Sequence, residues 1–204
     1  SDVCSSDLDH RRPLGHHDHH HRRGVAHDGA KTSVKRRLVL LALVATSIVL
    51  QAAVLPEMRV LGVVPDLGAL LAVSVAMHEG SDTGALVGFA AGLGFDFFVE
   101  SPLGLWALSF AVAGWAVGPI QGGFIRVPRV VPLLLGAFAG VVAGSCYIVL
   151  GVITGVDGLV AWRTLGILGR TILFDIALAP LVFFIVSKLL TERTVAASYR
   201  LGPQ

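Results

Sequence analysis

Charged residues are scarce in this sequence of 204 residues, and they are unevenly placed. Asp, Glu, Lys and Arg make up 15% of the chain, and 13 of these 30 residues lie in the first 37 positions. Hydrophobic residues make up 54%, and the mean hydropathy is +0.75. A membrane-spanning helix needs about 20 predominantly apolar residues, and several such runs are present. The sequence therefore predicts an all-α polytopic membrane protein, and its net charge of +2 gives no indication of a nucleic-acid partner.

Cysteine is almost absent. Cys4 lies in residues 1–8, SDVCSSDL, which match the in-frame translation of a common sequencing-adaptor string. We expect these eight residues to be an artefact and exclude them from the fold. Cys146 then stands alone within an apolar segment, so it cannot form an intramolecular disulfide and indicates no redox compartment.

Catalytic motifs are also missing. The sequence contains neither HExxH nor GxSxG, and no histidine is paired with a carboxylate in the apolar segments. The glycines before Asp96 resemble the GxGD motif of intramembrane aspartyl proteases, but the aspartate follows Gly94 by two residues and a second aspartate motif is missing. We therefore predict no enzyme activity, no cofactor and no metal site.

Residues 9–37 are polar and rich in histidine and arginine. We predict a disordered cytoplasmic tail, because no ligand spacing or apolar partner is present. Metal binding is the alternative, since imidazole suits zinc, nickel and copper. Seven histidines belong to this tail: His10, His16, His17, His19, His20, His21 and His27.

Six membrane helices are predicted over residues 38–190, and a polar cytoplasmic tail over 191–204. Pro56 ends the first helix, and Pro65 is expected at the first position of the second. A tight polar turn is expected at 78–82 and a basic loop at 122–129. The expected helices cover residues 38–55, 65–77, 83–99, 103–120, 130–153 and 164–190.

Basic residues set the expected orientation. Short cytoplasmic loops carry an excess of Lys and Arg, so both termini are predicted to be cytoplasmic in a bacterial inner membrane. The other side then holds only Arg59 and Arg163. Counted from Lys31 onward, the cytoplasmic set is Lys31, Lys35, Arg36, Arg37, Arg126, Arg129, Lys188, Arg193 and Arg200.

The stretch 84–104 is expected to be a buried central helix that carries one carboxylate. Gly84, Gly88 and Gly92 recur at four-residue spacing, and Gly136, Gly140 and Gly144 repeat this pattern in the fifth helix. Small residues at this spacing allow membrane helices to pack closely, either within the protein or against a partner helix. We favour packing within the protein.

Ionisable residues within the apolar segments fall near one predicted depth. Asp66 and Asp96 lie near the outer face, Arg170 lies about two turns below it, and Asp175 lies deeper. Because an unpaired ion is costly there, we hypothesise that Asp96 and Arg170 form an ion pair. The alternatives are that each residue reaches the interface separately, or that they form a proton or substrate relay.

Three motifs in order resemble the MreD family of rod shape-determining proteins. They are Pro65-Asp66-Leu67, the run from Gly88 to Asp96, and Pro102-Leu103-Gly104, with a last helix that reads ALAPLVF. The resemblance covers about 38–190. It implies a non-catalytic inner-membrane protein that works beside MreB-like and MreC-like proteins, a glycan polymerase and a class B penicillin-binding protein. It also implies a six-helix fold similar to the S-components of energy-coupling-factor transporters.

Two functions remain open on this basis. The first is a scaffold that organises peptidoglycan synthesis during cell elongation, and the second is a substrate-binding subunit of a vitamin-type transporter. Few polar side chains occur in the first and fourth helices, which favours the scaffold. The candidate site residues are Asp66, Asp96, Pro102, Gly104, Arg170 and Asp175.

Overall fold

The computed structural model describes residues 19–54, 64–99, 102–118, 130–155 and 162–198. Within these ranges six α-helices and one π-helical segment are present, and there are no strands. The elements are α1 (His19–Val49), η1 (Leu50–Val54), α2 (Leu67–Glu79), α3 (Ser81–Asp96), α4 (Leu105–Trp115), α5 (Val131–Ile153) and α6 (Trp162–Ser198). The chain divides into two compact units, Ser1–Arg37 and Leu38–Gln204. The second unit holds α2 to α6 and is described below.

Three helices are long and apolar enough to cross a membrane: Val34–Ala53, Val131–Ile153 and Thr164–Leu190. The helices α2 and α4 are apolar but have only 13 and 11 residues. At about 1.5 Å per residue they reach roughly 17–20 Å, which is less than the ~30 Å hydrocarbon core. The predicted helices therefore exist in the predicted order, but three long spans are established, not six.

Several helix boundaries in the structure differ from the predicted ones. The first helix begins at His19, so residues 19–37 are helical where a disordered tail was expected, and α6 continues to Ser198 beyond the predicted end at 190. Extending an existing helix costs much less than starting one, which accounts for polar turns added to apolar spans. The expected turn at 78–82 shrinks to Gly80, with φ of +94°. Pro65 precedes the N-cap Asp66 and does not occupy the first helical position.

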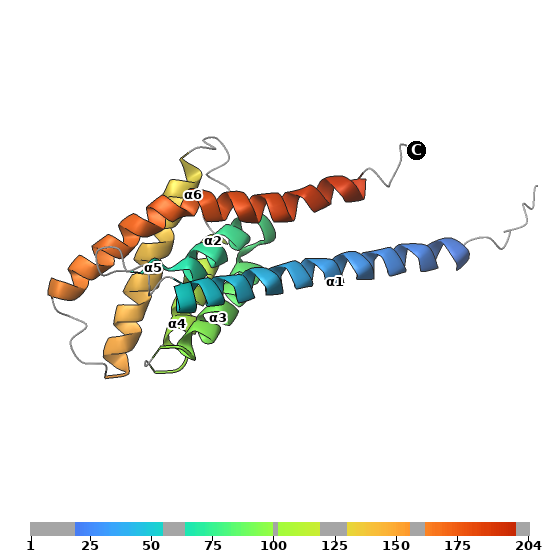
Figure 1. Cartoon of the computed structure of the whole chain (residues 1–204). Helices are drawn as coiled ribbons and strands as arrows, with labels where there is room; N and C mark the ends of the chain where they lie inside the picture. Colours follow the sequence, from blue (N-terminus) through green and yellow to red (C-terminus); the bar gives the residue numbers. More distant parts are fainter. Residues whose placement is uncertain (1–18, 55–63, 100–101, 119–129, 156–161, 199–204) are drawn as a thin grey trace, which may run out of the picture. The chain divides into compact units, whose positions relative to one another are not determined.

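The central helix is α2, and the prediction that residues 84–104 form it is wrong. All ten residues from Leu67 to Ala76 are buried. The run LGALLAVSVA is apolar or small on every side, and a helix that is hydrophobic all round is buried. By contrast, α3 buries one face and leaves Leu86 68% exposed. In Figure 1, α2 lies in the middle of the bundle.

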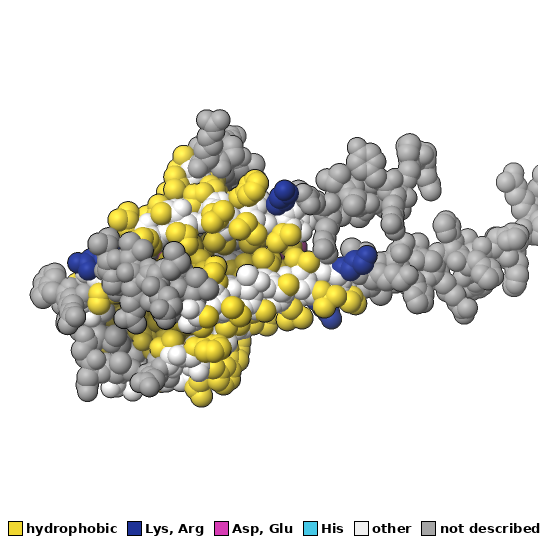
Figure 2. All heavy atoms as spheres, in the orientation of Figure 1, with side chains coloured by type: hydrophobic (Ala, Val, Ile, Leu, Met, Phe, Trp, Pro, Cys, Tyr) yellow, Lys and Arg dark blue, Asp and Glu magenta, His cyan; other side chains and the backbone are white. Residues whose placement is uncertain are grey.

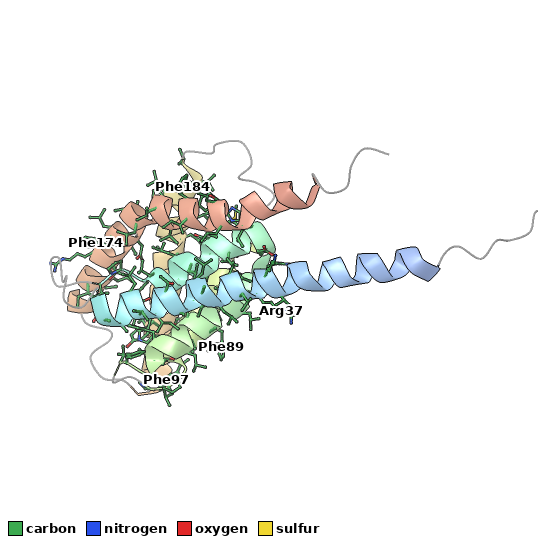
Figure 3. The ribbon with its side chains drawn as sticks, turned by 45° about the vertical axis from the view of Figure 1, so that its right-hand side comes forward. Arg37, Phe89, Phe97, Phe174 and Phe184 are labelled. Carbon is green, nitrogen blue, oxygen red and sulfur yellow. The ribbon has the colours of Figure 1, made fainter. Side chains whose placement is uncertain are left out.

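Two apolar clusters meet on α2. One joins it to α4, α5 and α6 around Leu70, Val73 and Phe110. The other joins it to α1, α3 and α6 around Leu71, Val75 and Val186. Figure 2 shows that the described surface is mostly hydrophobic with few charged side chains, and in Figure 3 the labelled phenylalanines lie on the outside of the helices. Such a surface suits contact with lipid.

Gly80 is expected to be essential for the α2–α3 turn. With φ of +94° and ψ of 157° it occupies a region open almost only to glycine. Gly80→Ala should lower the free energy of unfolding by about 1–3 kcal/mol, measured by denaturant titration in detergent micelles. The control is Gly169→Ala on α6, where an added Cβ meets no atom within 4 Å. That change should be neutral or raise stability by roughly 0.5–1 kcal/mol, and equal losses in both variants would contradict the prediction.

Candidate functional site

Asp96 caps the N-terminus of α4. Its carboxylate is 2% exposed and accepts three backbone N–H groups. Oδ2 accepts from Gly104 at 2.9 Å and from Ala107 at 3.2 Å, and Oδ1 accepts from Trp106 at 3.2 Å. The first N–H groups of a helix lack partners within it and carry partial positive charge, so a carboxylate is stabilised there. Asp96 thus joins the end of α3 to the start of α4.

The loop residues between these helices shape that cap. Gly104 has φ of +96° and is the N-cap of α4. The carbonyl of Pro102 accepts the N–H of Leu105 at 3.3 Å, while the side chain of Pro102 is exposed. Both candidate residues therefore act through the backbone, by turning the chain so that the first amides of α4 face Asp96.

The hypothesised ion pair between Asp96 and Arg170 is absent. Both residues are described, and Arg170 is exposed on α6 while Asp96 is buried against α4. The backbone N–H groups of α4 provide the compensation that we had assigned to the guanidinium. Arg170 therefore does not form the predicted ion pair with Asp96 within the described residues.

The start of α2 is capped by side chains from two other helices. Oδ1 of Asp175, on α6, accepts the N–H of Asp66 at 2.8 Å. Oε1 of Gln51, in η1, accepts the N–H of Gly68 at 3.0 Å. Asp66 itself makes no capping hydrogen bond through its side chain. The first turn of α2 is therefore held by the end of the first helix and by the last helix.

Asp175 is fully buried and is only partly satisfied. Its Oδ2 has no hydrogen-bond partner in the described part of the chain. This oxygen lies 2.7 Å from where a Cβ on Gly140 would be, beside Ile172. A buried carboxylate with one unpartnered oxygen carries a large desolvation cost. The missing side chain of Gly140 is what makes room for it.

Four aromatic rings lie next to the capped start of α4. Trp106 contacts Tyr147 of α5 at 4.3 Å between ring centroids, and Phe95 and Phe110 each at 5.5 Å. The indole Nε1 of Trp106 is buried and has no partner among the described residues. Trp106 donates its backbone N–H to Asp96, so the ring contact with Tyr147 joins α5 to the cap of α4. We call Gln51, Asp66, Asp96, Trp106, Tyr147 and Asp175 the capping cluster.

Three members of the capping cluster, Gln51, Trp106 and Tyr147, were not among the predicted site residues. Gln51 is the only amide side chain in the apolar run of the first helix, and it is 2% exposed. A lone polar residue at such a position is a recognisable sign of an internal hydrogen bond. Tyr147 follows Cys146 in the fifth helix and has no comparable sign, because tyrosine is common in apolar segments.

The glycine stripes lie where helices approach closely. An added Cβ on Gly92 would lie 2.5 Å from backbone atoms of Trp106 and Ala107, and one on Gly84 would lie 2.8 Å from the carbonyl oxygen of Ala72. Gly88 faces both α2 and α4. In α5, Gly136, Gly140 and Gly144 each face α6. All six glycines therefore face other helices of this chain.

The cavity found among the described residues is small and apolar. It lies between α2, α5 and α6 and leaves no room for a water molecule. It does not include the capping cluster. Within the described ranges, no group of three or more His, Cys, Asp or Glu side chains is placed to hold a metal ion.

Some predictions lie outside the described residues. They include the artefact at 1–8, the first three histidines of the tail and the basic loop at 122–129.

Comparison with protein families identifies the relationship. The family model for the rod shape-determining protein MreD matches residues 31–193. The chain belongs to the MreD family. Searches of curated proteins and of solved structures found no significant match. Membership in MreD, together with the apolar helices, makes this chain a membrane protein of the MreBCD system that determines rod shape, with partners of the MreB and MreC type.

Proposed function

We propose that this MreD protein is a non-catalytic scaffold of the cell-elongation machinery that helps to maintain rod shape by organising peptidoglycan synthesis. The observation that carries the proposal is that its own side chains occupy the helix N-termini. Short helices in membrane proteins can direct their first N–H groups at an anionic substrate. Here Asp96 takes that position at α4, and Asp175 and Gln51 take it at α2.

A substrate-binding function receives less support. A ligand of vitamin size needs a pocket of roughly 300–1,000 Å³ with a few polar groups. The cavity between α2, α5 and α6 leaves no room for a water molecule, has mainly apolar walls and lies apart from the capping cluster. The buried carboxylates Asp96 and Asp175 are bound to backbone amides, which also supports a structural role over acid–base chemistry.

The proposed partners are an MreC-like protein and a glycan polymerase with its class B penicillin-binding protein. Aromatic side chains on several helices are available to them. Phe97 is 72% exposed beside the α3–α4 connection, Phe89 is 43% exposed on α3, and Phe184 is 62% exposed on α6. Side chains that lie outward on different helices can contact different partners, which is the arrangement a scaffold requires.

Photo-crosslinking in growing rod-shaped cells tests this proposal. A photoreactive residue would replace Phe89, Phe97 or Phe184 in turn, and Phe95, half-buried against Trp106, is the matched control. We expect adducts with an MreC-like protein or a cell-wall synthase from at least one exposed position and none from Phe95. Adducts only with an energising transporter subunit would overturn the scaffold proposal.

The proposed topology is multi-pass with both termini in the cytoplasm. Lys188 is exposed near the end of the last apolar span, and Thr154 is exposed just after α5. In a variant without native cysteines, Lys188→Cys should be modified by a membrane-impermeant reagent only after cell lysis. Thr154→Cys should be modified in intact spheroplasts, and the opposite pattern would reverse the topology.

A further inference from the structure

The last helix, α6, consists of two arms, one before and one after Pro180. Pro180 lies inside the helix and removes the hydrogen bond that would reach the carbonyl of Ile176. Figure 1 shows α6 changing direction part-way along its length. The arm before Pro180 packs on α5 at Gly136, Gly140 and Gly144. The arm after it packs with Val186 against Val44 of α1 and Val75 of α2.

Asp175 lies in the first arm, five residues before Pro180, and links that arm to α2 through the N–H of Asp66. The second side chain at this helix start, Gln51, belongs to a π-helical segment. π-Helical turns are rare and frequently occur at functional sites. The start of α2 is therefore the point where η1 and the first arm of α6 meet.

The link made by Asp175 is costly to maintain. Its Oδ2 is buried without a partner in the described structure, in the space left by Gly140. A partly satisfied buried polar group is less favourable than a fully satisfied one or an apolar side chain. The second arm is held by other contacts, through Val186 in the apolar cluster with α1 and α2.

From these features we propose that Asp175 is a latch that sets the angle of α6 at Pro180. With the hydrogen bond to Asp66 made, the first arm is held against α5 and the start of α2. With it broken, the first arm swings about Pro180 while the second arm keeps its position. The latch acts through the acceptor oxygen Oδ1 and not through a negative charge. It would connect contacts at the start of α2 with contacts along the first arm, beyond the static scaffold proposed above.

Distance measurements between spin labels on the full-length protein in lipid nanodiscs test the latch. Native cysteines are replaced by serine. One label at Leu86 of α3 is paired with a label at Leu165 in the first arm, or with one at Leu189 in the second. All three side chains are exposed, with fractions of 68%, 54% and 39%. The two pairs separate movement of the first arm from loosening of the whole bundle.

We compare Asp175→Asn, which keeps an acceptor oxygen, with Asp175→Ala, which removes it. Asp175→Ala should increase a second distance for Leu86–Leu165 about tenfold in population and leave Leu86–Leu189 unchanged. Asp175→Asn should match the unmodified chain. The matched control is Thr171→Ala, because Thr171 is buried on the same arm but bonds only to its own helix at Ile167.

A second variant protects the test against misfolding of Asp175→Ala. Gly140→Ala places a Cβ at 2.7 Å from Oδ2 and should displace the carboxyl, giving the same second distance. Unchanged distances in both variants would overturn the latch. So would an equal effect of Asp175→Asn and Asp175→Ala, because the charge would then matter, or parallel changes in both label pairs, because the arms would then move together.

Discussion

Replacing Asp96 with alanine is expected to abolish rod-shape maintenance and to lower the free energy of unfolding by about 3 kcal/mol or more. The change removes the acceptor of three backbone N–H groups at the start of α4. Each buried donor that loses its partner costs about 1–3 kcal/mol. Two of the three donors are part-buried, so water can compensate in part and the estimate stays at the lower end of the sum.

The functional loss follows from the length of α4. A helix of 11 residues forms few hydrogen bonds, so its position depends on its cap and on its packing with α3. Without Asp96, the start of α4 loses its link to the end of α3, and Trp106 moves relative to Tyr147. The measurements are denaturant titration in micelles and the fraction of rod-shaped cells after depletion of the host's own MreD protein.

Asparagine at position 96 distinguishes the cap from other roles of the carboxylate. An amide oxygen in the place of Oδ2 keeps the bonds from Gly104 and Ala107, but its NH₂ group then faces the N–H of Trp106. Asp96→Asn should therefore lie between the unmodified chain and Asp96→Ala in both stability and function. The control is Asp82→Ala, at an exposed carboxylate in the first turn of α3. An Asp96→Ala protein as stable as this control would show that the cap contributes little.

Asp96 also shows how much of the site could be predicted from the sequence. A carboxylate in an apolar run requires compensation, and that requirement was predicted correctly. The partner was not predicted, because the residue types indicate only side chains of opposite charge as partners. The actual donors are backbone N–H groups at the start of a helix that begins nine residues later. No residue type in the sequence indicates such donors. A residue's position along its helix gives its depth, but it does not give the direction in which it points.

The same limit explains why α3, and not α2, was predicted to be the central helix. The uniformly apolar run from Leu67 to Ala76 indicates burial on all sides, yet the glycine stripe of α3 drew attention to that helix instead. A stripe marks one closely packed face, and the opposite face of α3 is exposed. Helix order and type follow from hydropathy alone. Gln51 and Asp175 cap the start of α2 from other helices, and their hydrogen-bond partners are 17 and 109 positions away along the chain. These three-dimensional contacts could not be predicted from the sequence.

The second large effect is expected at Gly88. Its added Cβ would contact the carbonyl oxygen of Phe110 and lie 2.7 Å from the carbonyl carbon of that residue, and 2.8 Å from Cβ of Ala72. These neighbours belong to α4 and α2, which both pack on this face of α3, and the backbone atoms of Phe110 cannot turn aside as a side chain does. Gly88→Ala should therefore lower the free energy of unfolding by about 1–3 kcal/mol and reduce the fraction of rod-shaped cells.

A graded series tests whether close backbone approach is the cause. An added Cβ on Gly144 would contact Cδ1 of Leu168, the flexible end of a side chain, and one on Gly166 would meet no atom within 4 Å. Gly144→Ala should consequently cost less than Gly88→Ala, and Gly166→Ala should cost nothing. When two apolar helices exchange contact with lipid for contact with each other, they gain no hydrophobic free energy. Their association therefore depends on van der Waals contact at short distance. If Gly144→Ala and Gly88→Ala were equally damaging, the spacing between the helices would not be set by backbone contact at the α3 stripe.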